Sequence, residues 1–359
     1  MTDTRDNLKA LAEQIDWPFV SQDFALIDRL DRKSLGDVWF EADIPFNLSM
    51  PHFFVPFGST PTSETVGLYL HPRAMARQKL PVISLAEEGQ LIEVAPSLPI
   101  YLHYLLTNME AYAVEDGDDP MESMAEELDW IGEILGGDFY AIGQHGDDPD
   151  VFNTDTVDRY IIDTFGGSAR NFIRTPGWRK QPTTDTIAHL ERGIAANPSS
   201  LALHARLAIY YHKNGRLEAA LQSITSALKC YRHTEGWNDL KNLRQLVLDL
   251  SHSGYAIGDR QVIRELMEDN ADKRVEQIVS LYREEAFEPC AKLLDDLCYE
   301  VCTYDYRPIH ELLQEIYRRL GWNWLQPFMS QRKLFEADDL ARDFARKNLQ
   351  ADWDAPLRA

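Results

Sequence analysis

Hydrophobic positions change their period along the chain. Between residues 38 and 95 the apolar residues form short runs, rich in aromatic and β-branched side chains and bounded by Pro or Gly, as β-strands are. These runs lie at 38–40, 53–55, 66–70, 81–85 and 90–94. Ser97, a good N-cap residue, then precedes apolar residues three and four apart: Leu98, Tyr101, Leu102, Leu105 and Leu106. Consecutive strands followed by a helix predict an antiparallel sheet with helices on one face, an α+β domain.

The most regular stretch predicts a helical hairpin between residues 201 and 230. We expect one helix over 201–213 and another over 217–230, because Asn214 and Gly215 tolerate the left-handed conformation that ends helices. Apolar or small residues recur at helical spacing on both: Leu207, Ala208, Tyr211, Ala220, Ile224 and Ala227. With Gly215, they resemble a tetratricopeptide (TPR) repeat, a unit of about 34 residues. His204 and Arg232 depart from that pattern, and an ordinary helical hairpin is the alternative.

Helical periodicity continues on both sides of this hairpin. Upstream of the sheet, Phe24, Ile27 and Leu30 predict a helix that closes at Gly36. Downstream, apolar residues in 275–282 and 287–297 predict another hairpin, a degenerate repeat or part of an all-α cap. The predicted fold class is therefore α+β, an N-terminal antiparallel sheet with helices followed by an all-α, TPR-like helical-hairpin region. The expected domains are 1–112, an acidic linker with connecting helices over 113–182, and 183–359.

A second resemblance covers about residues 50–106. Pro56-Phe57-Gly58, Val66-Gly67-Leu68-Tyr69-Leu70, Pro81-Val82-Ile83 and then Ala95, Ser97 and Leu98 follow in an order that resembles the SUKH superfamily. The expected upstream Leu-Pro step, into a helix ending at an Asn-Gly pair, is missing. The resemblance implies a binding domain without catalytic residues, because bacterial members often protect the producing cell by binding toxins, many of them nucleases. An unrelated small α+β domain is the alternative.

Charge is distributed unevenly. The formal net charge is -22, and residues 1–150 hold 28 acidic and 8 basic side chains against 30 and 28 in the remainder. Such a surface repels nucleic acid and anionic membranes, and it speeds the capture of basic partners. We therefore expect a basic protein partner and neither nucleic acid nor membrane, with solubility alone as the other interpretation.

Two sets of residues are candidate contacts for a protein partner. The first is an acidic cluster, which is otherwise a solvated linker: Glu115, Asp116, Asp118, Asp119 and Glu122. The second comprises Ile209 and His212, opposite the packed face of the first hairpin helix, unless a neighbouring helix covers Ile209. A calcium loop at Asp116 is disfavoured, because Pro120 occupies a ligand position and Met121 replaces the turn glycine.

Catalytic and metal-binding patterns are missing from the sequence. No Gly-rich run precedes Lys-Ser or Lys-Thr, and the cysteines, Cys230, Cys290, Cys298 and Cys302, lack paired zinc-ligand spacing. We expect no cofactor, no metal and no enzyme. A cytoplasmic location is expected, because neither a signal peptide nor an apolar run of about 18 residues is found. The predicted function is an intracellular, immunity-type factor that binds and occludes a basic toxin. A TPR-type adaptor unrelated to toxins is the alternative, followed by an enzyme with an unrecognised site.

Overall fold

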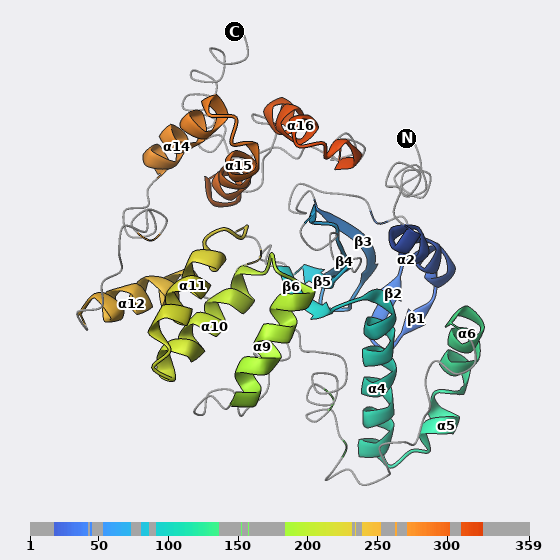
Figure 1. Ribbon diagram of the computed structural model, residues 1–359. Helices are drawn as coiled ribbons and strands as arrows, with labels where there is room; N and C mark the ends of the chain where they lie inside the picture. Colours follow the sequence, from blue (N-terminus) through green and yellow to red (C-terminus); the bar gives the residue numbers. More distant parts are fainter. Residues whose placement is uncertain are drawn as a thin grey trace. The chain divides into compact units, whose positions relative to one another are not determined.

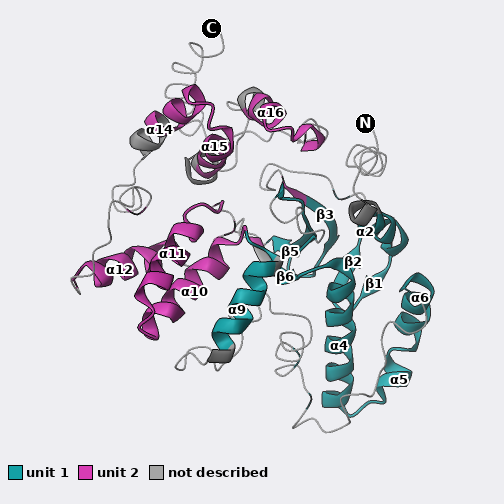
Figure 2. Ribbon diagram, viewed as in Figure 1, with its two compact units in different colours: residues 1–44, 55–87, 92–198 teal, residues 45–54, 88–91, 199–359 magenta. Residues whose placement is uncertain are grey.

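The computed structural model (Figure 1) describes part of the chain, in two compact units. The described residues are 18–41, 44, 53–72, 80–85, 91–135, 152, 157, 184–231, 234, 239–252, 263, 271–301 and 310–325. The first unit is Met1–Ile44, Val55–Glu87 and Ile92–Pro198, and the second is Pro45–Phe54, Glu88–Leu91 and Ser199–Ala359 (Figure 2). The predicted α+β class is confirmed. The domain limits at 112 and 182 stay a prediction, since most of 136–183 lies outside the described residues.

A six-stranded antiparallel sheet follows the helix α2 (Pro18–Leu30). Its strands are neighbours in sequence order: β1 (Ser34–Leu35), β2 (Val38–Phe40), β3 (Phe54–Ser59), β4 (Thr65–Tyr69), β5 (Val82–Leu85) and β6 (Leu91–Ala95). All five predicted strands are present, and β1 is additional. The predicted closure of the first helix at Gly36 is wrong, because α2 ends at Leu30. Gly36 instead takes φ +55° in the tight β1–β2 turn, where Leu35 pairs with Val38.

The central strands are buried along nearly their whole length. Every residue of β5 is buried, as are most of β3 and β4, whereas Trp39 of β2 points outward. Continuous burial shows that both faces of the central strands are covered. The helix α4 (Leu98–Asp116) contributes to this cover, because its Tyr101 ring meets Phe57 of β3 edge to face at 6.4 Å. The predicted helix start is confirmed, although the Ser97 side chain makes no capping hydrogen bond.

Among the described residues of the first unit, three further helices are α5 (Pro120–Ser123), α6 (Ala125–Leu135) and α9 (Thr184–Ala196). The start of the predicted linker is therefore helical. Near it, Ala111 and Val114 of α4 share a buried cluster with Phe152 and Val157, so α4 is buried on more than its sheet-facing side.

Helices make up most of the described second unit. They are α10 (Leu201–Lys213), α11 (Leu217–Ala227), α12 (Asp239–His252), α14 (Ala271–Arg283), α15 (Phe287–Val301), α16 (His310–Arg319) and a 3-10 helix, η4 (Asn323–Leu325). The predicted hairpins are confirmed as α10–α11 and α14–α15, with α11 ending at Ala227 rather than at 230. The small residue Ala208 is fully buried in the core that α10 and α11 share with α12, and Ala220 of α11 is fully buried as well.

Three turns in the described helical segments have the same hydrogen bonds. A left-handed residue follows the helix at Gly215, Glu285 and Gly321, with φ of 69°, 57° and 75°. In each turn the next N–H donates to the carbonyl five residues back, at 2.9, 2.9 and 2.7 Å. The end of α4 has this motif too, but only in these three turns does a helix resume two residues after the left-handed position. The second unit therefore repeats one helix–turn–helix connection.

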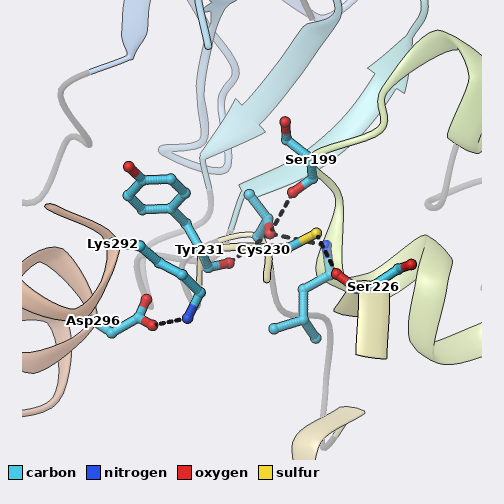
Figure 3. Close-up of polar contacts among 8 residues, drawn as sticks. Ser199, Ser226, Cys230, Tyr231, Lys292 and Asp296 are labelled. Carbon is cyan, nitrogen blue, oxygen red and sulfur yellow. Dashed lines mark hydrogen bonds and ion pairs between the residues drawn. The ribbon is translucent and has the colours of Figure 1, made fainter. Parts of the chain in front are cut away.

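Thr234 fastens the loop after α11 to the start of α10. The Leu201 N–H donates to Thr234 Oγ1 at 3.0 Å, and this hydroxyl donates to the Tyr231 carbonyl at 2.6 Å, with the Ser199 carbonyl 3.2 Å away (Figure 3). One helix N–H that has no partner within α10 is thereby satisfied. The same bonds hold the backbone at Tyr231 in one place.

Candidate partner-binding surfaces

Five predicted contact residues lie together where α4 passes into α5. Gly117 ends α4 in the left-handed conformation, and Asp119 caps α5 by accepting the Met121 N–H at 2.8 Å. These two devices turn the chain sharply. The acidic corner, as we name it, consists of the exposed residues Glu115, Asp116, Asp118, Asp119 and Glu122.

Contacts from α2 and the following loop fix the helix beyond the acidic corner. Arg29 donates to the carbonyl oxygens of Glu133 and Ile134, at 2.7 and 2.6 Å, at the C-terminal end of α6. A cation is favourable there because the last carbonyls of a helix carry partial negative charge. Lys33 lies 4.9 Å from the centre of the Trp130 ring on the same helix. The acidic corner therefore lies between two helices, α4 and α6, and each of them is fixed by contacts within the first unit.

Two exposed apolar side chains flank the acidic corner. Tyr112 is 50% exposed and Met121 is 59% exposed. Tyr112 precedes Glu115 and Asp116 by three and four positions, so all three share one face of α4. Protein interfaces are enriched in Tyr and Met. Neither residue was predicted as a partner contact; for Tyr112, the exposed side of α4 depends on where Ala111 and Val114 pack.

Negative charge dominates the sequence around this surface. Residues 101–150 contain fourteen acidic side chains and no Lys or Arg. Like charges so close together are not neutralised by neighbours along the chain, and they produce a field that attracts basic molecules. The arrangement can therefore bind a cationic surface through its carboxylates and seat that surface on Tyr112 and Met121.

The other predicted contacts, Ile209 and His212, belong to the second unit and are not part of the acidic corner. Both lie on α10 and are half-buried. Ile209 packs against the core cluster that includes Leu243 and Val247 of α12. This position corresponds to the alternative in which a neighbouring helix covers Ile209. His212 lies in the last turn of α10, and its carbonyl accepts the Gly215 N–H at 2.9 Å.

One buried carboxyl group in the first unit has a strongly raised pKa. Glu93 of β6 is 3% exposed, and burial raises its pKa to about 8, with the Asn197 side chain offsetting part of that rise. A carboxyl group with such a pKa is mainly protonated at neutral pH. Its place in the interior assigns it to the packing of β6 near Asn197 rather than to a surface site.

The described residues contain neither a metal site nor a membrane-spanning helix. Within the described part of the chain, no group of three or more His, Cys, Asp or Glu side chains is placed to hold a metal ion. Nor does that part contain a helix long and apolar enough to cross a membrane. Comparisons with protein-family models, curated proteins and solved structures found no match.

Proposed function

We propose that this chain is a protein-binding protein that captures a basic partner on the acidic corner. The observation that carries the proposal is the combination of five exposed carboxylates with the exposed Tyr112 and Met121 around the turn from α4 to α5. Its most concrete form is a cytoplasmic, immunity-type factor that occludes a basic toxin. Such a toxin, if it acts on nucleic acid, needs a positive surface to hold phosphates.

Binding would proceed in two steps and without chemistry. Long-range attraction first raises the association rate, an effect that falls with ionic strength because salt screens exposed charges. Tyr112 and Met121 then pack against the partner and exclude water around the contacts. Buried aromatic and apolar anchors contribute most of the affinity in protein interfaces, while rim charges mainly affect the association rate. The complex should therefore form faster at low salt and persist at high salt.

Affinity capture from the source lysate, at low and then high salt, tests this proposal. We expect one strongly basic protein that is toxic when expressed alone and harmless when expressed with this chain. A fivefold variant, Glu115→Gln, Asp116→Asn, Asp118→Asn, Asp119→Asn and Glu122→Gln, should slow association at least tenfold. Tyr112→Ala with Met121→Ala should instead speed dissociation.

The matched control changes five exposed acids outside the acidic corner. It combines Glu191→Gln, Glu218→Gln, Asp249→Asn, Glu276→Gln and Glu284→Gln, with the same change in net charge. If association slows equally in both variants, only the total charge matters and the acidic corner is not the binding surface. Capture of neutral or acidic proteins alone would overturn the basic-partner proposal.

A TPR-type adaptor is the second candidate, favoured by the repeated turns of the second unit. The left-handed residues at 215, 285 and 321 are separated by 70 and 36 residues, so the first interval is about twice the second. A period near 35 residues agrees with the approximately 34 residues of a TPR unit. Partners of such an adaptor should still bind the fivefold acidic variant. They should be lost when His212 is replaced by Ala.

A further inference from the structure

A single phenylalanine from outside the helices lies in an aromatic cluster of the second unit. Phe53 precedes β3 and belongs to the segment Pro45–Phe54, which is part of the second unit. Its ring centre lies 5.3 Å from that of Tyr231, 6.1 Å from Tyr317 and 5.9 Å from Trp322. Phe53 is completely buried. Two of these contacts are edge to face, the arrangement that aromatic pairs prefer.

The three surrounding rings come from two separate turns. Tyr317 and Trp322 lie on opposite sides of the turn at Gly321, and their own rings are 5.7 Å apart. The Trp322 N–H donates to the Tyr317 carbonyl at 2.7 Å, so the turn itself fixes the spacing of this pair. Tyr231 follows α11, and the bond from Thr234 to its carbonyl holds it (Figure 3). These three side chains are named here the aromatic socket.

An equivalent turn elsewhere in the unit is covered differently. At Gly215 the corresponding positions are Tyr211 and Arg216, and the Arg216 guanidinium lies 4.3 Å from the centre of the Tyr211 ring. The Tyr211 ring is therefore covered by a side chain of its own turn. At Gly321 a tryptophan replaces the arginine, and Phe53, distant in sequence, inserts between the Tyr317–Trp322 pair and Tyr231. The two turns have the same backbone hydrogen bonds. They differ in the side chain five residues after the tyrosine, which is Arg216 in one turn and Trp322 in the other.

We propose that the aromatic socket is a recognition site for an extended segment that presents one aromatic ring, and that Phe53 occupies it in cis as an intramolecular latch. The inference does not depend on the acidic corner. Because Phe53 is tethered to the socket, its effective concentration is of the order of millimolar, and it suppresses binding of a similar ring in trans. A partner that presents such a ring competes with Phe53 and displaces its side chain from the aromatic socket.

Binding of a labelled peptide to the full chain tests the latch. The probe is a fluorescein-labelled peptide with the sequence of residues 47–55 and Phe54→Leu, so that Phe53 supplies its single phenyl ring, and the control peptide carries Phe53→Ala as well. Fluorescence anisotropy should show that the probe binds the F53A chain at least tenfold more tightly than the wild-type chain. The wild-type and F53A chains should both bind the control peptide only weakly. Trp39→Ala, a change at an exposed aromatic residue of the sheet, should leave probe binding at the wild-type level.

A second variant protects the test against loss of folding. If circular dichroism shows that F53A has lost its helical signal, F53L is used, because leucine fills more of the site. Equal binding of the probe to the wild-type chain and to the folded Phe53 variant would overturn the proposal. Equal binding of the probe and the control peptide would overturn it as well, because the socket would then not recognise the ring.

Discussion

The hairpins α10–α11 and α14–α15 have the same connection but different interiors. Residues 215 and 285 are both left-handed and both follow the same pattern of hydrogen bonds. Seventy residues after Ala208 and Ala220 stand Ile278 and Cys290, all four of them buried. In the second hairpin the Cys290 thiol donates to the Ile278 carbonyl at 3.6 Å. The connection therefore persists although Ala208 and Ala220, two of the small residues on which the TPR resemblance rests, have larger counterparts here.

Polar groups on the second helices differ as well. Ser226 of α11 accepts the Cys230 thiol through its carbonyl at 3.3 Å, whereas α15 has Asp296 at the corresponding place, paired with Lys292 at 2.6 Å (Figure 3). Both members of that ion pair are largely buried. A buried acid needs such a partner because desolvation disfavours its charge. The same backbone connection therefore accommodates two different sets of interior residues. Those of the first hairpin are the ones that resemble a TPR repeat.

Replacing Ala220 with Leu should produce the largest effect on stability. The side chain is fully buried, and extra methylene groups in a packed core typically cost about 1–3 kcal/mol. We expect the free energy of unfolding of the full chain, from urea titration, to fall by about 2 kcal/mol. Gln222→Ala, at an exposed position of α11, is the control. A loss no larger than that of the control would show that the first hairpin has space around residue 220 for a larger side chain.

Exchanging the left-handed residues should have opposite effects in the two hairpins. A Cβ at Gly215 would contact nothing within 4 Å, so Gly215→Ala introduces only backbone strain. The left-handed conformation costs about 1–2 kcal/mol for a residue with a Cβ, partly offset by a smaller entropy of the unfolded chain. We expect a loss of about 1 kcal/mol, and a slight gain for Glu285→Gly. Thermal unfolding checks both, and changes of the same sign would contradict the equivalence of the turns.

The regular elements could be predicted from the sequence because their signals are local. Aromatic and β-branched runs located five strands, and the Asn214-Gly215 pair located the central turn. The strand β1 was missed because its two residues are too few to show a period. The turn at Glu285 had no glycine to reveal its conformation, although the hairpin around it was correctly predicted from apolar spacing.

The candidate sites depended more on contacts between distant residues. Runs of Asp and Glu identified the acidic corner directly. Exposure of Tyr112 follows from which side of α4 is covered, and Ile209 is half-buried because α12 packs on α10; neither fact can be derived from α4 or α10 alone. Phe53 reads as part of a strand, and nothing next to it in the sequence indicates Tyr231 or Trp322.

Cys290→Ala would restore the first hairpin's small residue in the second. The change removes a fully buried sulfur and its hydrogen bond, and we expect a loss of about 1 kcal/mol, less than for Ala220→Leu. Burial raises the pKa of the Cys290 thiol to about 12, so the native chain keeps it protonated at pH 8. A thiol-reactive dye at that pH should label Cys290 only after unfolding, as peptide mapping can show. Rapid labelling of the native chain would contradict the packed interior of this hairpin.

Arg216→Ala should give the smallest effect and probes the difference between the turns at 215 and 321. Arg216 is exposed, and a cation above an aromatic ring at such a site contributes about 0.5 kcal/mol. Lys213→Ala, whose ammonium group lies 5.9 Å from the Tyr210 ring against 4.3 Å for Arg216 and Tyr211, is the matched control and should cost less. Arg216→Trp introduces the residue found at Trp322. If the two turns differ because Arg216 covers the Tyr211 ring, the Arg216→Trp variant should bind the labelled 47–55 peptide at the turn of Gly215. This binding should occur even though Phe53 still fills the aromatic socket. The Arg216→Ala variant should not bind the peptide there.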